Sequence, residues 1–151
     1  MAEDASISSL LDRVARTAPF RRELAKLGTE EQAVFDHTAL PGVPFVAALC
    51  INSVPETCRT WVVTPHLRAQ ESVASQLETW GVHNILFVPE KEVALGEEVG
   101  DPELTAERLN VLHRIASGQI GRLTVVLTEN SLNDEVPSTR GMKNQGMICL
   151  L

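Results

Sequence analysis

The chain has 151 residues, of which 44% are hydrophobic and only 4% aromatic, and its formal net charge is −7. This length suits one domain with an aliphatic core, and so high an aliphatic content excludes a fully disordered chain. The acidic balance argues against direct binding of nucleic acid, since domains that bind DNA or RNA alone usually present a basic surface. No run is long and apolar enough to span a bilayer, so no membrane partner is expected.

Charged residues are unevenly distributed along the sequence. Basic residues gather near the N-terminus, and acidic residues dominate the stretch after residue 89. We interpret both groups as solvated faces. The basic residues are Arg13, Arg16, Arg21, Arg22 and Lys26, and the acidic residues are Glu90, Glu92, Glu97, Glu98, Asp101, Glu103 and Glu107.

The three cysteines, Cys50, Cys58 and Cys149, form no CxxC pair. An odd number of cysteines without a disulfide framework is typical of a reducing compartment. The first residues are polar and charged, so no signal peptide is expected. The sequence therefore predicts a cytoplasmic protein.

The N-terminal third of the chain predicts helices and one short strand. Apolar residues recur at helical spacing within 6–18, and a second helix is predicted over 19–28. A strand is predicted over 34–37. After the turn at Pro41-Gly42 comes an apolar run, for which periodicity does not distinguish a buried strand from a buried helix, although its alanines favour helix.

The rest of the chain alternates strands with helices. Strands are predicted over 59–64, 84–89 and 122–128, where β-branched and apolar residues are concentrated. Helices are predicted over 66–81, with Thr64 as its cap, and over 102–118. This alternation implies parallel strands with right-handed crossovers. The fold class is therefore α/β, with a parallel sheet between two layers of helices.

The segment LPGVPFVAAL lies where a nucleotide-binding α/β protein would carry its phosphate-binding loop. A working loop, G-x-x-x-x-G-K-[ST], supplies backbone N–H groups, a lysine and a hydroxyl that holds magnesium. The segment has one glycine, no lysine and no such hydroxyl, and its second proline removes an N–H group. We expect no cofactor at this degenerate loop. Its residues are Leu40, Pro41, Gly42, Val43 and Pro44.

Other reactive side chains form no catalytic or metal-binding pattern, and none is predicted to have such a role. The four histidines show neither HxH nor HExxH spacing, and the two serines of the helix predicted over 66–81 lack a nucleophile-elbow context. Glu129 is expected to be a solvated loop residue. Trp61 and Trp80 are expected to pack in or near the core, and Arg108 to pair with an acidic neighbour. The histidines are His37, His66, His83 and His113, and the serines are Ser72 and Ser75.

Several stretches match the pattern of one protein family in order and spacing. WVVTPHLRAQESVASQLETWG is similar to LVVTPxxxxAExLxxDLxxxG, and DPELTAERLNVLHRIASG to xxExxxxRLxxLxxLxxG, with Glu107, Arg108 and Leu109 as its most telling run. LPGVPFVAAL is similar to the degenerate loop GLxGSAxALLxA, with GVP in place of GSA. Over residues 7–138 the chain thus resembles the N-terminal module of the bacterial transcription-repair coupling factor, Mfd, itself related to the excision-repair protein UvrB.

This resemblance implies a P-loop-NTPase-like fold, similar to the first domain of UvrB, with a degenerate nucleotide site. It implies a helical segment over 1–30 packed on the domain, a UvrB-like α/β subdomain over 31–137, and an atypical, flexible tail over 138–151. The parent family is an ATP-dependent DNA translocase that acts on stalled RNA polymerase and recruits UvrA in nucleotide excision repair. The expected partners are other domains of the parent, because the regions that contact UvrA and RNA polymerase lie outside the similarity.

We therefore expect a non-catalytic scaffold module of a DNA-repair coupling protein. One alternative is a small nucleotide-binding domain with an unusual loop, which would be stabilised by ATP and magnesium. Another is a stand-alone interaction protein that uses its acidic loop or its basic helices, for which an ordered, packed C-terminal tail is expected.

Overall fold

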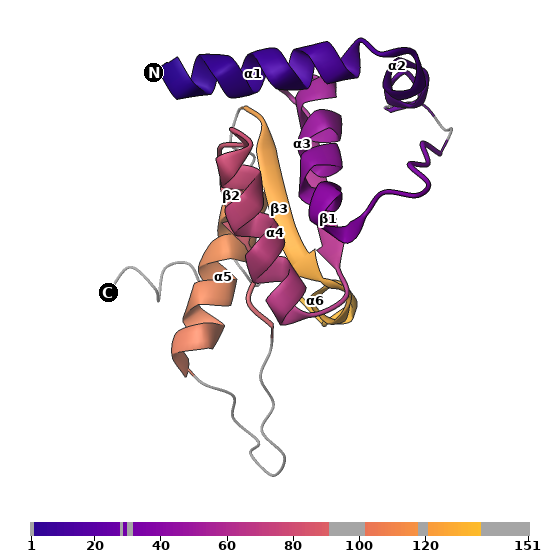
Figure 1. Cartoon of the computed structure of the whole chain (residues 1–151). Helices are drawn as coiled ribbons and strands as arrows, with labels where there is room; N and C mark the ends of the chain where they lie inside the picture. The colour runs from indigo at the N-terminus through magenta and orange to yellow at the C-terminus, as the bar shows by residue number, and fades with distance from the viewer. Residues whose placement is uncertain (1, 28, 30–31, 91–101, 118–120, 137–151) are drawn as a thin grey trace.

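A computed structural model of the chain describes residues 2–27, 29, 32–90, 102–117 and 121–136, which form an α/β fold around a small parallel sheet (Figure 1). The sheet has three strands in the order β1-β3-β2. They are β1 (Arg59–Thr64), β2 (Ile85–Phe87) and β3 (Leu123–Thr128). The last strand in the sequence therefore lies in the centre, and all its residues are buried.

Helices cover both faces of the sheet. Val126 of β3 packs on one face against Leu49 and Leu77, while its neighbour Val125 packs on the opposite face against Val111. This alternation follows from the two-residue period of a strand. The first face carries α1 (Ala2–Ala15), α3 (Val43–Ser53) and α4 (Leu67–Thr79), and the second carries α5 (Pro102–Ala116).

Three short elements complete the described chain: α2 (Ala18–Leu24), the 3₁₀ turn η1 (Leu40–Gly42) and α6 (Glu129–Asn133). The predicted strand over 59–64 is confirmed, and the ambiguous apolar run after Pro41-Gly42 is a helix.

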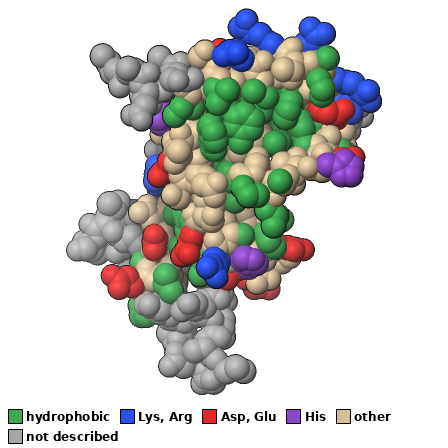
Figure 2. Space-filling view, in the orientation of Figure 1, with side chains coloured by type: hydrophobic (Ala, Val, Ile, Leu, Met, Phe, Trp, Pro, Cys, Tyr) green, Lys and Arg blue, Asp and Glu red, His purple; other side chains and the backbone are tan. Residues whose placement is uncertain are grey.

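Basic side chains gather over α1 and α2, where Arg13, Arg16, Arg21 and Arg22 are exposed (Figure 2). Most of the acidic loop and the predicted tail over 138–151 lie outside the described residues.

The strand predicted over 34–37 is wrong. The backbone N–H of Val34 donates to the Glu23 carboxylate at 3.1 Å, and His37 has a φ of 61°, in the left-handed region. A left-handed residue interrupts the extended conformation that a strand needs. The segment is instead a connection between α2 and η1.

Only one of the two tryptophans packs in or near the core, as predicted for both. Trp80 packs edge-to-face against Phe45, with ring centroids 4.9 Å apart. Trp61 is 48% exposed, and the prediction for it is wrong. It lies on an edge strand, on the face covered by α5, where the core contains residues of β2, β3 and α5 but none of β1.

Cys50 and Cys58 are free thiols, and Cys149 lies outside the described residues. Within the described ranges, no helix combines the length and apolar character needed to cross a bilayer.

Leu11 of α1 is buried in the core formed by α3, α4 and the sheet. This contact fixes α1 on the body of the molecule.

Candidate functional site

Ligands of open parallel sheets bind outside the carboxyl ends of the strands. Here that edge is formed by Thr64 at the end of β1, by Pro89 and Glu90 after β2, and by Thr128 at the end of β3. Both α3 and α4 begin toward this edge and run back along the sheet (Figure 1). The edge is therefore where a nucleotide-binding site of this fold class would lie.

The predicted degenerate loop forms η1 and leads directly into α3. Gly42 has a φ of −86° and a ψ of −13°, a right-handed conformation open to any residue. Its N–H group donates to the Ala39 carbonyl at 2.7 Å and so is already used. A phosphate-binding nest instead turns successive N–H groups toward one point. Leu40, at 87% exposure, and Val43 present exposed apolar side chains at this turn.

The side chain of Thr128 is bonded within the fold. Its hydroxyl donates to the Glu90 carboxylate at 2.5 Å and accepts from the backbone N–H of Ser131 at 3.2 Å, which caps α6. Asn130 also donates to Glu90, at 3.4 Å. Thr64, at the end of β1, donates to the Leu127 carbonyl at 3.2 Å. Both strand-terminal hydroxyls therefore stabilise the edge itself.

Gln70 is fully buried on α4, in a role that the sequence did not predict. Its Nε2 donates to the Val88 carbonyl at 2.8 Å and to the Val126 carbonyl at 2.9 Å, so it links the residue after β2 to the interior of β3. The available signal was its spacing: Gln70 lies two helical turns before Leu77 and so shares its inward face. A buried amide at this position bonds backbone carbonyls of the sheet.

Arg108 pairs with an acidic neighbour, as predicted. Its guanidinium lies 3.1 Å from the Asp134 carboxylate and donates to the Pro89 carbonyl at 2.7 Å. A longer contact of 3.4 Å joins it to the Ser131 carbonyl. The side chain is almost completely buried, and it connects α5 with the end of β2 and with α6.

The histidines, the two serines of α4 and Glu129 do not form a common site. The four histidines are exposed, and among the described residues no group of three His, Cys, Asp or Glu could hold a metal ion. His66, not Thr64, is the cap of α4, because its Nδ1 accepts from the Ala69 N–H at 3.1 Å. Ser72 and Ser75 are exposed on α4, and Glu129 is the exposed first residue of α6 rather than a loop residue.

Two described groups with a shifted pKa also lie away from the carboxyl edge. Hydrogen bonds from the Lys26 ammonium and the Val34 N–H hold the pKa of Glu23 below its usual value. Burial raises the pKa of the Cys50 thiol. A raised pKa keeps Cys50 protonated at neutral pH and makes it a poor nucleophile.

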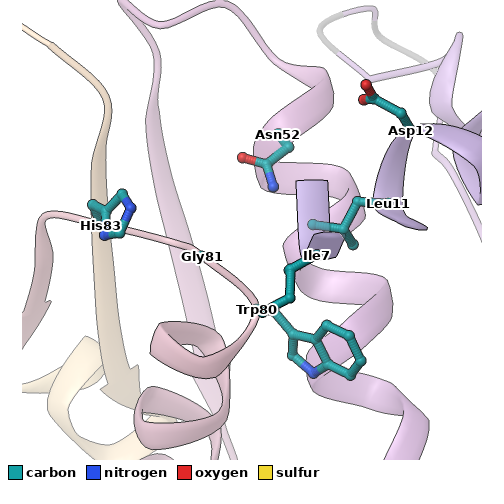
Figure 3. Close-up of a pocket in the computed structure, with 7 residues that line it drawn as sticks. All are labelled: Ile7, Leu11, Asp12, Asn52, Trp80, Gly81 and His83. Carbon is teal, nitrogen blue, oxygen red and sulfur yellow. The ribbon is translucent and has the colours of Figure 1, made fainter. Parts of the chain in front are cut away.

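A cavity of about 370 Å³ lies at the opposite edge, between α1 and the turn that follows α4 (Figure 3). Its apolar wall includes the buried Leu11 and the half-buried Trp80, while Asp12 and His83 contribute polar groups at its rim. Asn52 also lines it, and its Oδ1 accepts from Arg122 at 2.9 Å. The sequence did not predict this cavity because its walls come from distant segments.

Neither a family model, nor a curated protein, nor a solved structure matches the chain. Its function must therefore be inferred from its own residues. At the carboxyl edge these residues provide internal hydrogen bonds, one buried ion pair and an exposed apolar turn.

Proposed function

We propose that the chain is a non-catalytic scaffold module related to the N-terminal UvrB-like module of the coupling factor Mfd. In this proposal the fold is P-loop-NTPase-like, and its nucleotide site has degenerated into a structural edge. The observation that carries the proposal is that polar side chains at the carboxyl edge are bonded to one another within the fold: Thr128 bonds Glu90 at 2.5 Å, and Arg108 pairs with Asp134 at 3.1 Å.

The charges at this edge also disfavour a triphosphate. Glu90 and Glu129 bring negative charge to it, and the guanidinium of Arg108 is already paired. The exposed Arg68 of α4 offsets one of the two carboxylates. Binding several phosphate charges normally requires a lysine, backbone N–H groups and a magnesium ion acting together. The residues of η1 supply neither the lysine nor a free N–H group at Gly42.

Exposed apolar residues near the same edge suit contact with another protein surface. Leu40 begins η1, Val43 begins α3, and Leu67 begins the neighbouring α4. Grouped apolar side chains on a protein surface often mark interaction sites. We therefore assign docking to the surface formed by Leu40, Val43 and Leu67, which we call the apolar tip.

The proposed partners are the other domains of a coupling factor. Contacts with UvrA and RNA polymerase would belong to regions outside the similarity, and no direct contact with nucleic acid is proposed. A protein acting in this setting is cytoplasmic. Its role is architectural: it holds neighbouring domains in place and performs no chemistry.

The test is binding in trans. The chain, immobilised through a tag, is exposed to an Mfd protein from which the corresponding N-terminal module has been deleted. We expect saturable binding that Leu40→Asp weakens at least tenfold, because a charge would then occupy the apolar tip. Leu132→Asp makes the same leucine-to-aspartate change at an exposed leucine of α6. It is the matched control and should bind like the wild type. An absence of binding, or equal loss in both variants, would contradict the proposal.

A further inference from the structure

The outer edge of β1 has no partner strand among the described residues. β1 pairs with β3 on one side only, and its register runs without interruption from Arg59↔Leu123 to Thr64↔Thr128. Natural sheets protect such edges with prolines, bulges, inward-pointing charges or a covering segment. Between Arg59 and Thr64 the sequence has no proline, and the regular register leaves no bulge.

The sheet face that α5 covers remains apolar where it reaches this edge. Trp61 and Val63 are 48% and 47% exposed, whereas their register partners on β3, Val125 and Leu127, are buried. The apolar layer of this face thus continues onto β1, where its side chains are exposed to solvent. An edge that is both unpaired and apolar is a favourable site for strand addition.

We propose that β1 pairs with β1 of a second copy of this chain, in antiparallel orientation, around a two-fold axis at Val62. The two sheets then form one continuous sheet of two copies. Trp61 of each copy lies opposite Val63 of the other, and Thr60 lies opposite Thr64. Aromatic with β-branched pairs and Thr–Thr pairs are the favourable cross-strand combinations.

The sequence of β1 favours this register over the two nearest alternative registers. A shift of two residues is the smallest that keeps each side chain on its own face. An axis at Trp61 would put Arg59 opposite Val63, and an axis at Val63 would put Trp61 opposite Pro65. Of these three arrangements, only the axis at Val62 leaves neither Trp61 nor Val63 opposite a charge or a proline.

Charges at the two ends of β1 are complementary in the same arrangement. Exposed Glu56 precedes the strand and exposed Arg68 follows it. Antiparallel pairing brings the Glu56 end of one copy to the Arg68 end of the other, at both ends of the shared strand. Arg59 lies at the rim, opposite Pro65.

The dimer is expected to be weak for two reasons. The net charge of −7 on each copy opposes association, and one strand pair buries less area than a standard protein interface.

Sedimentation velocity over a concentration series, from low micromolar to near millimolar, tests the proposal. The wild type should show a reversible monomer–dimer equilibrium. Val63→Lys should weaken it at least tenfold, because the exposed side chain adds a charge to the edge without disturbing the core. Val34→Lys, at a valine of similar exposure in the connection before η1, should leave it unchanged. A wild type that stays monomeric throughout, or equal effects of the two lysines, would overturn the proposal.

A charge-pairing variant tests the register. In the Trp61→Glu/Val63→Lys double variant, each lysine faces a glutamate of the other copy, so dimerisation should recover relative to Val63→Lys alone. Trp61→Lys/Val63→Lys should show no recovery. Failure of the first variant to recover would overturn the axis at Val62, and binding of the edge by an unrelated apolar peptide in place of a second copy would overturn the choice of partner.

Discussion

Arg108 and Asp134 form an ion pair of 3.1 Å that ties α5 to the segment after α6. Because the guanidinium also bonds the Pro89 carbonyl at 2.7 Å, its removal leaves buried acceptors without a donor. Arg108→Met should lower the free energy of unfolding by about 2 to 3 kcal/mol. Urea unfolding followed by circular dichroism measures the change. Arg114→Met, at an exposed position of the same helix, should stay within about 0.5 kcal/mol of the wild type.

Two buried threonines of β3 should respond in opposite directions to the same substitution. The Thr124 hydroxyl is fully buried and has no hydrogen-bond partner within the described residues, so Thr124→Val should raise the unfolding free energy by about 1 kcal/mol. The Thr128 hydroxyl bonds Glu90 and the Ser131 N–H, so Thr128→Val should lower it by about 1 to 2 kcal/mol. Thermal unfolding of both variants tests this contrast, and a destabilised Thr124→Val would contradict it.

Gly42, the last residue of η1, should be replaceable, unlike Gly81, which follows the end of α4. A Cβ at Gly42 would meet Thr38 Cγ2 at 3.5 Å, an ordinary contact, so Gly42→Ala should stay within about 0.5 kcal/mol of the wild type. Gly81 has a φ of +75°, and Gly81→Ala should cost about 1 kcal/mol through backbone strain alone. Urea unfolding measures both. A strongly destabilised Gly42→Ala variant would show that the turn needs its glycine after all.

The lowered pKa of Glu23 predicts an acid-sensitive connection between α2 and η1. A carboxylate whose pKa is depressed on folding stabilises the fold above its unfolded pKa, about 4.3 for Glu, and this stability is lost as the pH falls through the folded value. Protonation should release the Val34 N–H and the Lys26 ammonium. Glu23→Gln should therefore show a smaller loss of stability between neutral and acidic pH than the wild type. An NMR titration that gives Glu23 an ordinary pKa would contradict this account.

Local sequence patterns were sufficient to predict most of the regular elements. The β-branched residues of β1 and β3, and the helical spacing of α4 and α5, are strong signals within one segment. Residues 34–37 carried a weak signal of the same kind. The strand predicted there does not form, because the Glu23 carboxylate accepts from the Val34 N–H and His37 turns the chain. The central position of β3 depends on contacts between segments far apart in the sequence.

The site was harder to predict than the fold. The absence of lysine and hydroxyl groups from the loop is a property of one segment, and the pairing of Arg108 was anticipated from its place on a helix face. The roles of Gln70 and His66 depend on which backbone groups happen to be near them in space. The exposure of Trp61 follows from the position of β1 at the edge, and its composition gives no indication of this.

The most direct test of the central claim is an NMR titration of ¹⁵N-labelled chain with ATP and magnesium. If the carboxyl edge is a structural edge, the amide signals of Gly42, Thr64 and Thr128 should stay in place up to millimolar nucleotide. Saturable shifts centred on Gly42 and the start of α3 would show a nucleotide seated at η1, and they would contradict the assignment of this chain as a scaffold.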